Sequence, residues 1–471
     1  MSARRLLVAL GLAGLAAAVR AHTFVQGNDD GDVGTYVLVA REALHGVLPY
    51  AGVWEYKPPG LFAAYAAALV LVHDGSLAVA VLGVAAVTIT AILVWHIAAR
   101  ITDGSERAGV LAAIFVICCT IENDGLLGDA ELLTLPFAAG AFAMLAGRVT
   151  TARIAGAGIL AMGAVQMKLS AAPVAVAALS AAIALRGAGA IVSFVAAFLA
   201  PAALEAACYV ALHRFDVLWD ANVGATLRRV GTRVSAPLAQ FTEQLLRLAP
   251  AIELAPFAAL RRNRWTGIII AWLAADIVSL LLVGEYDRRQ FLPLAAPLAV
   301  LGARGFDALA PRVRAAGLTA GVVVLTFGLH GYYEVASTVR VIVARVTAPG
   351  SAAGASEIDL IARRLAQRSL RRDGAWFFEV SPILYDRLDV SPPTRYPLTS
   401  NLDNPRLWPM LGFRGDVELR RILDVRPAWI VARGCGPWAA PAPCALVTDG
   451  IARRYEVVEQ LDARTTLYHR R

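Results

Sequence analysis

The sequence predicts an α-helical polytopic membrane protein with a small C-terminal extracytoplasmic α/β domain. Of its 471 residues, 58% are hydrophobic and 17% are charged, and the mean hydropathy is +0.59. The apolar residues also gather in long runs that polar loops separate. A soluble globular protein carries more charge and fewer apolar residues. The composition therefore favours several membrane spans.

Eleven apolar runs are candidates for transmembrane helices. They comprise residues 6–19, 77–98, 108–121, 132–146, 154–167, 171–185, 191–212, 245–260, 265–283, 291–303 and 315–330. Several are shorter than the roughly 20 residues of a straight span, so their ends borrow flanking residues or the bilayer thins. The first run follows Arg4 and Arg5 and is either a cleaved signal peptide or, as we expect, a retained span. Both alternatives leave His22 on the outer side.

Basic residues between the runs set the predicted orientation. With the N-terminus inside, every inner loop carries arginines, as the positive-inside rule requires; they are Arg100, Arg107, Arg148, Arg153, Arg186, Arg261, Arg262, Arg264, Arg304, Arg312 and Arg314. The net charge of +8 therefore marks topology rather than nucleic-acid binding. The outer loops hold the acidic residues Asp29, Asp30, Asp32, Glu55, Glu122, Asp124, Asp129, Glu131, Glu285 and Asp287. We expect an N-in, C-out chain with its acidic motifs on the outer face.

The first outer loop, residues 22–76, is predicted to carry helices that lie along the membrane. Residues 61–72 are apolar, but a full span there would move the basic loop 100–107 to the outside. A half-inserted or interfacial helix avoids this conflict. Residues 35–44 show helical spacing of apolar side chains, and Gly46 is a helix stop.

Near Ala344 the composition becomes polar and rich in arginine, which predicts a transmembrane domain over 1–344 and a soluble domain over 345–471. The pattern indicates helices at 358–370 and 417–423 and strands at 375–380 and 428–432. Alternating helices and strands are typical of an α/β fold. Cys435 and Cys444 are candidates for a disulfide in an oxidising compartment, the alternative being two unpaired thiols.

Polar motifs recur at the outer ends of the apolar runs. They are Asp-Val-Gly-Thr-Tyr (32–36), Gly-Val-Leu-Pro-Tyr (46–50), Glu-Tyr-Lys-Pro-Pro-Gly (55–60), Gly-Asp-Ala-Glu (128–131), Lys-Leu-Ser (168–170) and Arg-Arg-Gln-Phe-Leu-Pro (288–293). Over about the first 300 residues the pattern resembles the GT-C fold glycosyltransferases that use polyprenyl-phosphate sugars, in particular the protein O-mannosyltransferase and lipid A aminoarabinose transferase family. The chain departs from that family in one place. Members often have Asp-Glu where this chain has Asp32-Val33, which leaves Asp29 and Asp30 as alternatives to Asp32.

Sugar transfer from a polyprenyl phosphate to a hydroxyl needs a carboxylate that accepts the acceptor proton. We assign this role to Asp32, against the alternative of a solvated acidic turn. The leaving phosphate gains charge in the transition state, and a fixed cation stabilises it. Lys57 suits this role, against the alternative of an interfacial lysine.

Further residues at outer ends form a second group of candidates. Donor phosphate binding is assigned to Lys168, Arg288, Arg289 and Tyr286. An acceptor-orienting or supporting acidic role is assigned to Asp30, Glu55, Asp129 and Glu131. Simple contact with lipid headgroups is the alternative for the arginines. Carboxylates can also hold a divalent metal, but no histidine pair suits zinc.

The resemblance implies a glycosyltransferase. The alanine- and arginine-rich composition indicates a bacterial inner membrane, and the predicted orientation puts the active site on the periplasmic side. Its partners would be a polyprenyl-phosphate monosaccharide, a glycan, lipid or protein acceptor, and membrane lipids, but no nucleic acid. No cofactor is certain, and a divalent metal is possible. The alternatives are a transporter or flippase of lipid-linked sugars and a non-catalytic membrane scaffold. A transporter would place charges midway along its spans, whereas here they lie at span ends.

Overall fold

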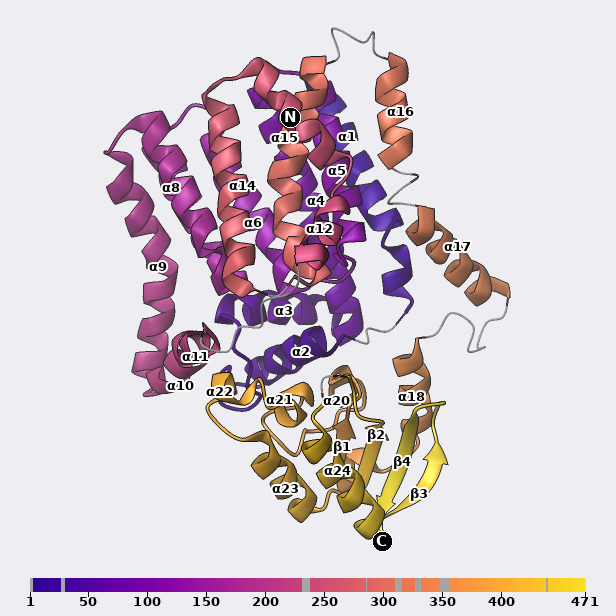
Figure 1. The fold of residues 1–471 in the computed structure, drawn as a ribbon. Coiled ribbons are helices and arrows are strands. Elements are labelled where there is room, and N and C mark those ends of the chain that lie inside the picture. The colour runs from indigo at the N-terminus through magenta and orange to yellow at the C-terminus, as the bar shows by residue number, and fades with distance from the viewer. Residues whose placement is uncertain are drawn as a thin grey trace. The chain divides into compact units, whose positions relative to one another are not determined.

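The computed structural model describes residues 3–26, 30–230, 238–284, 286–309, 316–326, 328, 332–347, 356–437 and 439–471. It forms two compact units (Figure 1). The helical unit comprises Met1–His22, Ala80–Leu212 and Val234–Arg340, and the mixed unit comprises Thr23–Val79, His213–Arg233 and Val341–Arg471. The first outer loop thus belongs to the same compact unit as the C-terminal segment. That the membrane part of the chain ends at residue 344 and the soluble part begins at residue 345 stays a prediction.

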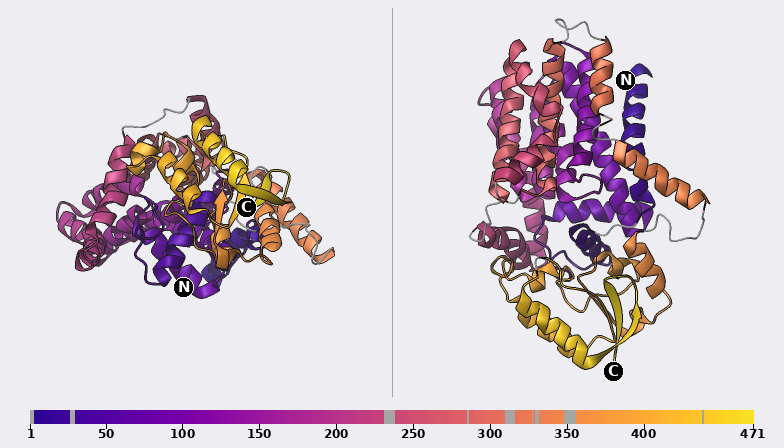
Figure 2. Two further views of the ribbon diagram at one scale, coloured as in Figure 1. Left: turned by 90° about the horizontal axis from the view of Figure 1, so that it is seen from below. Right: turned by 45° about the vertical axis from the view of Figure 1, so that its right-hand side comes forward.

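The helical unit is a bundle whose helices run side by side (Figures 1 and 2). Its helices, with those that continue across its borders, are α1 (Ala3–Ala18), η1 (Ala21–Phe24), α4 (Gly75–Ile101), α5 (Glu106–Glu122), α6 (Ala130–Leu145), α7 (Thr151–Met167), η2 (Leu169–Ala171), α8 (Ala172–Arg186), α9 (Ala190–Ala211), α12 (Leu238–Leu246), α13 (Ala251–Leu254), η4 (Ala255–Arg261), α14 (Arg264–Val283), η5 (Arg288–Leu294), α15 (Ala295–Leu309), α16 (Ala316–Thr326) and α17 (Tyr332–Thr347). Helix α7 packs against α6 and α9.

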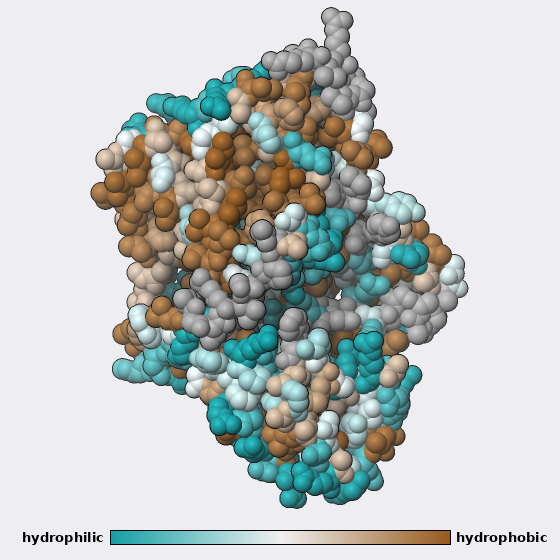
Figure 3. Space-filling view, in the orientation of Figure 1, coloured by the Kyte–Doolittle hydropathy of each residue, from teal (hydrophilic) through white to brown (hydrophobic). Residues whose placement is uncertain are grey.

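Within the described ranges, five helices are long and apolar enough to cross a membrane. They are Gly75–Ile101, Leu169–Arg186, Ala190–Ala211, Arg264–Val283 and Arg288–Leu309. Apolar side chains cover the visible face of α8, α9 and α14 (Figure 3). Val192 and Leu204 of α9 are 77% and 68% exposed, as expected of a helix that contacts acyl chains. The chain is therefore a multi-pass membrane protein, while the count of eleven spans and the orientation stay predictions.

One predicted span is not a single helix in the structure. The apolar run 245–260 is divided among the end of α12, the short α13 and the 3₁₀ helix η4. Pro250 and Pro256 lie within this run. Proline lacks a backbone N–H and clashes with the preceding helical turn, so each one interrupts an α-helix. Hydropathy alone did not reveal this break.

The mixed unit combines helices with a small sheet. Its helices are α2 (Gly31–Leu44), α3 (Pro59–Val72), α10 (Phe215–Trp219), the π-helix η3 (Asp220–Gly224), α11 (Ala225–Val230), α18 (Glu357–Leu365), α19 (Leu370–Asp373), α20 (Ile383–Arg387), α21 (Ser400–Asp403), α22 (Trp408–Leu411), α23 (Gly415–Val425) and α24 (Pro441–Arg454). Its strands are β1 (Ala375–Phe378), β2 (Trp429–Arg433), β3 (Tyr455–Gln460) and β4 (Thr465–Arg470). The two predicted helices and two predicted strands correspond to α18 with α19, α23, β1 and β2.

The sheet has the strand order β1-β2-β4-β3. Strands β1 and β2 are parallel, with Ala375 opposite Trp429, whereas β4 pairs antiparallel with both β2 and β3. Sequence analysis did not predict the β3–β4 hairpin. Strand β3 is exposed at most of its positions, so it lacks the buried apolar run by which β2 was recognised.

A compact apolar core holds this sheet to its helices. Leu419, Ile422 and Leu423 of α23 pack with Ile430 of β2 and Val447 of α24. Ile422 and Leu423 lie three and four positions after Leu419, so all three share one helix face, as an amphipathic surface helix requires.

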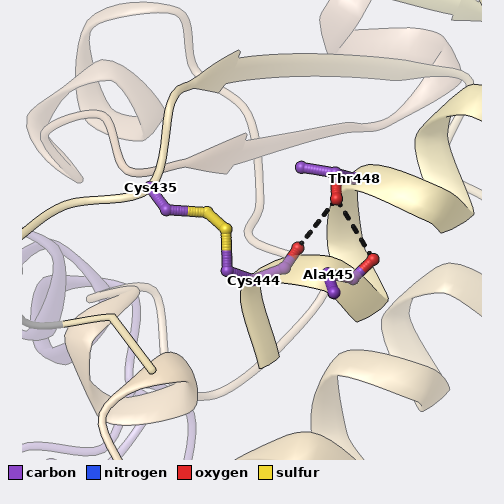
Figure 4. Close-up of a disulfide and its surroundings, with 4 residues drawn as sticks. All are labelled: Cys435, Cys444, Ala445 and Thr448. Atoms are coloured by element: carbon purple, nitrogen blue, oxygen red, sulfur yellow. Dashed lines mark hydrogen bonds between the residues drawn. A yellow bond between two sulfur atoms is a disulfide. The ribbon is translucent and has the colours of Figure 1, made fainter. Parts of the chain in front are cut away.

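Cys435, just after β2, and Cys444, in α24, form a disulfide with their Cα atoms 6.1 Å apart (Figure 4). The Thr448 hydroxyl donates to the carbonyl oxygen of Cys444 at 3.1 Å. The bond ties the end of β2 to the helix that packs on the core. Such bonds persist in oxidising compartments.

A pair of carboxyl groups lies beyond the end of β1. Asp403 at the end of α21 is 1% exposed, and Glu379, just after β1, lies close enough to act on it electrostatically. Burial, together with the neighbouring Glu379, raises the pKa of Asp403 from its ordinary value of 3.8 to about 8. The Asp403 carboxyl group therefore keeps its proton at neutral pH, where an ordinary aspartate is ionised.

This pair predicts a measurable pH dependence of stability. Between about pH 4 and pH 8 the folded state keeps a proton on Asp403 that the unfolded state has lost, so stability falls as the pH rises through this window. Asp403→Asn keeps a donor toward Glu379 and has no proton to lose. We expect it to flatten the fall in melting temperature of the detergent-solubilised chain between about pH 5 and pH 8. The exposed control Asp449→Asn should keep the wild-type slope; equal slopes in all three proteins would contradict the assignment.

Candidate active site

Helix α2 presents Asp32 in its first turn. Asp30 is the N-cap residue, and its Oδ1 atom accepts a hydrogen bond from the Val33 backbone N–H at 3.0 Å. Asp32 is half-buried, and none of the described residues donates a hydrogen bond or forms an ion pair to its carboxylate. A carboxylate in the first turn of a helix interacts favourably with the helix dipole. Asp29 and Glu285 lie outside the described residues.

Lys57 is held in a buried site of the same unit. It is 6% exposed, and its Nζ atom lies 4.0 Å from the centroid of the Tyr56 ring and 5.6 Å from that of Tyr36. The Glu55 Oε1 atom is 3.7 Å from the same nitrogen. Aromatic faces and a carboxylate both attract an ammonium group, which offsets the loss of its hydration.

The backbone of Lys57 is fixed independently of its side chain. The Tyr50 hydroxyl donates to the Lys57 carbonyl oxygen at 2.7 Å and accepts from Asn222 Nδ2 at 2.9 Å. Helix α3 begins at Pro59, with Pro58 as its N-cap. The prolines fix the backbone where the helix starts, as the Lys-Pro-Pro motif predicted.

Glu55 interacts electrostatically with both Asp32 and Lys57. It is 2% exposed and accepts a hydrogen bond from the Tyr56 backbone N–H at 3.0 Å. Burial raises the pKa of Glu55, the Lys57 charge opposes this effect, and the Asp32 charge adds to it. Asp32 and Lys57 are therefore both close enough to act electrostatically on Glu55.

Arg229 supplies a second cation that the sequence analysis missed. Its Nη1 atom donates to the Tyr56 hydroxyl at 2.7 Å, and its guanidinium carbon lies 5.3 Å from the centroid of the Tyr56 ring. The Tyr56 ring thus has both Arg229 and Lys57 near it. A signal was present: the pair Arg228-Arg229 falls in a predicted outer loop, against the positive-inside trend.

Residues of the C-terminal segment hold the loop that carries Lys57. The Trp54 backbone N–H donates to the Arg395 carbonyl oxygen at 2.7 Å, and Arg395 Nη2 donates to the Tyr50 carbonyl oxygen at 2.6 Å. The Trp54 ring lies 5.8 Å from that of Tyr396. On α2, Arg41 pairs with Asp386 at 2.7 Å. The site is thus positioned by chain from both ends of the sequence.

A second polar cluster lies in the helical unit. Lys168, just after α7, forms an ion pair with Glu131 and donates to the Gln290 Oε1 atom at 2.6 Å. A small cavity beside it is lined by Lys168 and Gln290 and, from α14, by Asp276 and Ser279. Asp276 is 3% exposed and was also missed, although an acidic residue inside an apolar run is a functional candidate.

The other candidates of the helical unit are dispersed. Asp129 is the N-cap of α6, where its Oδ1 atom accepts from the Leu132 N–H at 2.8 Å. Arg289 lies 3.7 Å from Asp124 and 3.8 Å from Asp287. The Tyr286 ring packs at 5.2 Å on Phe241. Arg288 is exposed.

The described ranges contain no group of three or more His, Cys, Asp or Glu side chains that could hold a metal ion. Glu131, one of the acidic candidates, is engaged by Lys168. Asp129 Oδ1 accepts the helix-capping hydrogen bond.

No protein-family model matches the chain, and no curated protein matches its sequence. Its fold is similar to ArnT from Cupriavidus metallidurans bound to undecaprenyl phosphate, with a TM-score of 0.70 and 13% identity over 99% of this chain and 98% of that chain. For ArnT in the apo state the TM-score is 0.66 and the identity is 14%, over the same shares of the two chains. The fold is also similar to that of the archaeal oligosaccharyltransferase AglB from Archaeoglobus fulgidus, in complex with an inhibitory peptide and a dolichol-phosphate. The TM-score is 0.53 and the identity is 11%, over 92% of this chain and 69% of that chain.

These likenesses show the fold of the chain. It has the GT-C fold, as the resemblance of its motifs over about the first 300 residues implied. At 11–14% identity the likeness concerns the fold.

The different surroundings of Asp30 and Asp32 predict different responses to substitution. Asp30→Ala removes an N-cap and is expected to lower the free energy of unfolding by about 1 kcal/mol, whereas Asp30→Ser keeps a capping oxygen and most of that stability. Asp32→Asn should change stability by less than about 0.5 kcal/mol, because none of the described residues pairs with its carboxylate. Thermal unfolding of the three variants checks this order. A larger loss in Asp32→Asn than in Asp30→Ala would show that Asp32 is structural.

Proposed function

We propose that this protein is a membrane glycosyltransferase that transfers a monosaccharide from a polyprenyl-phosphate donor to a hydroxyl acceptor. One observation carries the proposal: Asp32, a carboxylate with no partner among the described residues, lies in the electrostatic neighbourhood of Glu55 and the buried cation Lys57. A base for the acceptor and a cation for the phosphate are the two groups that this reaction needs. The GT-C fold supports the same class of reaction.

Asp32 is the proposed general base. The acceptor oxygen attacks the anomeric carbon, its proton passes to the Asp32 carboxylate, and the bond from that carbon to the phosphate oxygen breaks. The phosphate leaves with the bonding electron pair. One displacement of this kind inverts the anomeric configuration, as the family resemblance implies.

Lys57 and Arg229 are the proposed phosphate clamp. Both lie beside the Tyr56 ring, so a phosphate there would meet a compact ammonium and a forked guanidinium. Fixed charges stabilise the leaving group as its charge grows and need no reorganisation at that moment. Glu55 holds Lys57 in place, and its carboxylate reduces the net positive charge of the site before the donor binds.

The lipids in the similar structures, undecaprenyl phosphate and a dolichol-phosphate, support a lipid-linked donor. The proposed acceptor is a glycan, lipid or protein hydroxyl. The positive-inside pattern supports a site on the outer face of the membrane, which in the proposed bacterial inner membrane is the periplasmic face. Lys168, Glu131, Asp129, Arg288, Arg289 and Tyr286 are proposed as supporting residues for donor or acceptor.

Transfer of radiolabelled sugar from membranes charged with polyprenyl-phosphate monosaccharides tests this function. Asp32→Asn and Lys57→Ala are each expected to lower transfer at least about 100-fold at matched expression, since both remove groups that act in the transition state. The exposed controls Asp449→Asn and Arg464→Ala match the charge changes and should retain full transfer. Wild-type transfer in both site variants would remove the assignment and favour a transporter or a scaffold.

Arg229 gives a separate prediction. Arg229→Gln should lower the rate of transfer by about 10- to 100-fold, because one charged hydrogen bond to the phosphate is worth roughly 1.5–3 kcal/mol. Arg229→Lys restores the charge and should recover part of the loss. Steady-state kinetics over a range of donor concentrations checks this. If Arg229→Lys is as impaired as Arg229→Gln, the guanidinium acts through the Tyr56 hydroxyl and not as a phosphate charge.

A further inference from the structure

Two adjoining cavities open in the helical unit, near the loop between α4 and α5. The first has a volume of about 440 Å³ and is lined by residues of α1, α4, α5 and α16. The second, of about 330 Å³, is lined by residues of α1 and α4 and of the loop that follows. Arg5, Trp95 and Glu106 line both. The two cavities therefore adjoin, and we name them together the basic hollow.

Arginines dominate the charge of the basic hollow. Arg4, Arg5 and Arg107 line the first cavity, and Arg100 lines the second. Arg5 is engaged by Glu106, with Nη2 and Oε1 at 2.8 Å. Arg4, Arg100 and Arg107 are exposed and make no hydrogen bond or ion pair with any of the described residues. Asp103 and Glu106 are the acidic residues of the lining, so the hollow keeps an excess of positive charge.

Trp95 and Glu106 give the floor of the hollow a fixed shape. The Trp95 indole N–H donates to the Glu106 Oε2 atom at 2.9 Å, and Trp95 is 6% exposed. Both Glu106 oxygens therefore have partners, one in Trp95 and one in Arg5. The three unengaged arginines surround this arrangement and are available to a ligand with several anionic oxygens.

Exposed apolar side chains lie on two of the helices that line the basic hollow. On α1, Leu7 and Leu10 are 69% and 59% exposed, and on α4 Ile89 is 48% exposed. Leu7 lies one helical turn from Arg4, so the two are neighbours on the helix surface. A ligand that fits this surface has an anionic head beside the arginines and an apolar tail beside the leucines. A membrane phospholipid has both parts.

We infer that the basic hollow binds the headgroup of an anionic phospholipid with two phosphates. Basic pockets between transmembrane helices recognise such headgroups, and arginine binds phosphate oxygens in forked pairs. Arg4 and Arg107 receive one phosphate and Arg100 receives the other, while the acyl chains follow Leu7 and Leu10. The predicted orientation puts this end of the bundle in the cytoplasmic leaflet. The inference depends on the membrane embedding of the chain and not on the proposed transferase activity.

Native mass spectrometry of the delipidated full-length protein with added cardiolipin tests the site. Arg4→Gln/Arg107→Gln is expected to lower the affinity for cardiolipin at least about 10-fold, and Arg100→Gln alone to lower it by a smaller factor. The control Arg186→Gln/Arg262→Gln changes the charge equally at exposed positions outside the hollow and should bind within about 2-fold of wild type. Equal loss in both double variants would show that binding depends only on net charge and would overturn the site.

Melting temperatures measured with other lipids and with phosphate identify the ligand. Cardiolipin should raise the melting temperature of the wild type and raise it less in Arg4→Gln/Arg107→Gln, because a ligand that binds only the folded state stabilises it. Phosphatidylcholine should produce no such difference between the two proteins. Inorganic phosphate at the same concentration should leave the melting temperature unchanged. An equal rise with phosphate alone would overturn the lipid assignment, because the acyl chains would then contribute nothing.

Discussion

The buried ammonium group of Lys57 is the constraint on which the proposed site depends. A lysine that is 6% exposed loses most of its hydration, and nearby negative charge and aromatic faces offset this loss. Glu55 and the rings of Tyr36 and Tyr56 supply both. This arrangement leaves the cation fixed and poorly hydrated, a state in which a phosphate is bound more strongly than in water. The same carboxylate limits the repulsion between Lys57 and other cations before a donor arrives.

The C-terminal segment belongs to this arrangement as well. Arg395 and Tyr396 contact the loop that carries Lys57, and Asp386 pairs with Arg41 on the helix that carries Asp32. The base and the cation therefore keep their places through contacts with residues more than 300 positions away in the sequence. A sugar-transfer site needs such support because small displacements of a reacting group lower its rate steeply. The α/β part of the chain thus contributes to the geometry of the proposed site in addition to any role in acceptor binding.

The sequence predicted those features that depend on local patterns. The GT-C fold followed from the resemblance of the polar motifs to one family. The helices over 35–44 and 61–72 and the strands β1 and β2 followed from apolar patterns, although α2 and α3 begin a few residues earlier than predicted. Features set by tertiary contacts were not predicted. The break in the run 245–260 depends on two prolines inside an apolar stretch, and the β3–β4 hairpin lacks a buried apolar run. Arg229 gains its role only because folding brings it to Tyr56, 173 residues away. The carboxyl pair of Asp403 and Glu379 likewise forms only in the folded chain.

The most direct test of this account is an experimental structure of the full-length protein with undecaprenyl phosphate, at a resolution that shows the phosphate oxygens. The account predicts phosphate oxygens within about 3 Å of the Lys57 ammonium and the Arg229 guanidinium, with the Asp32 carboxylate facing the open side of the phosphate. A phosphate bound away from the Tyr56 ring, with Lys57 still paired only to Glu55, would contradict the central claim that this buried cation receives the leaving group.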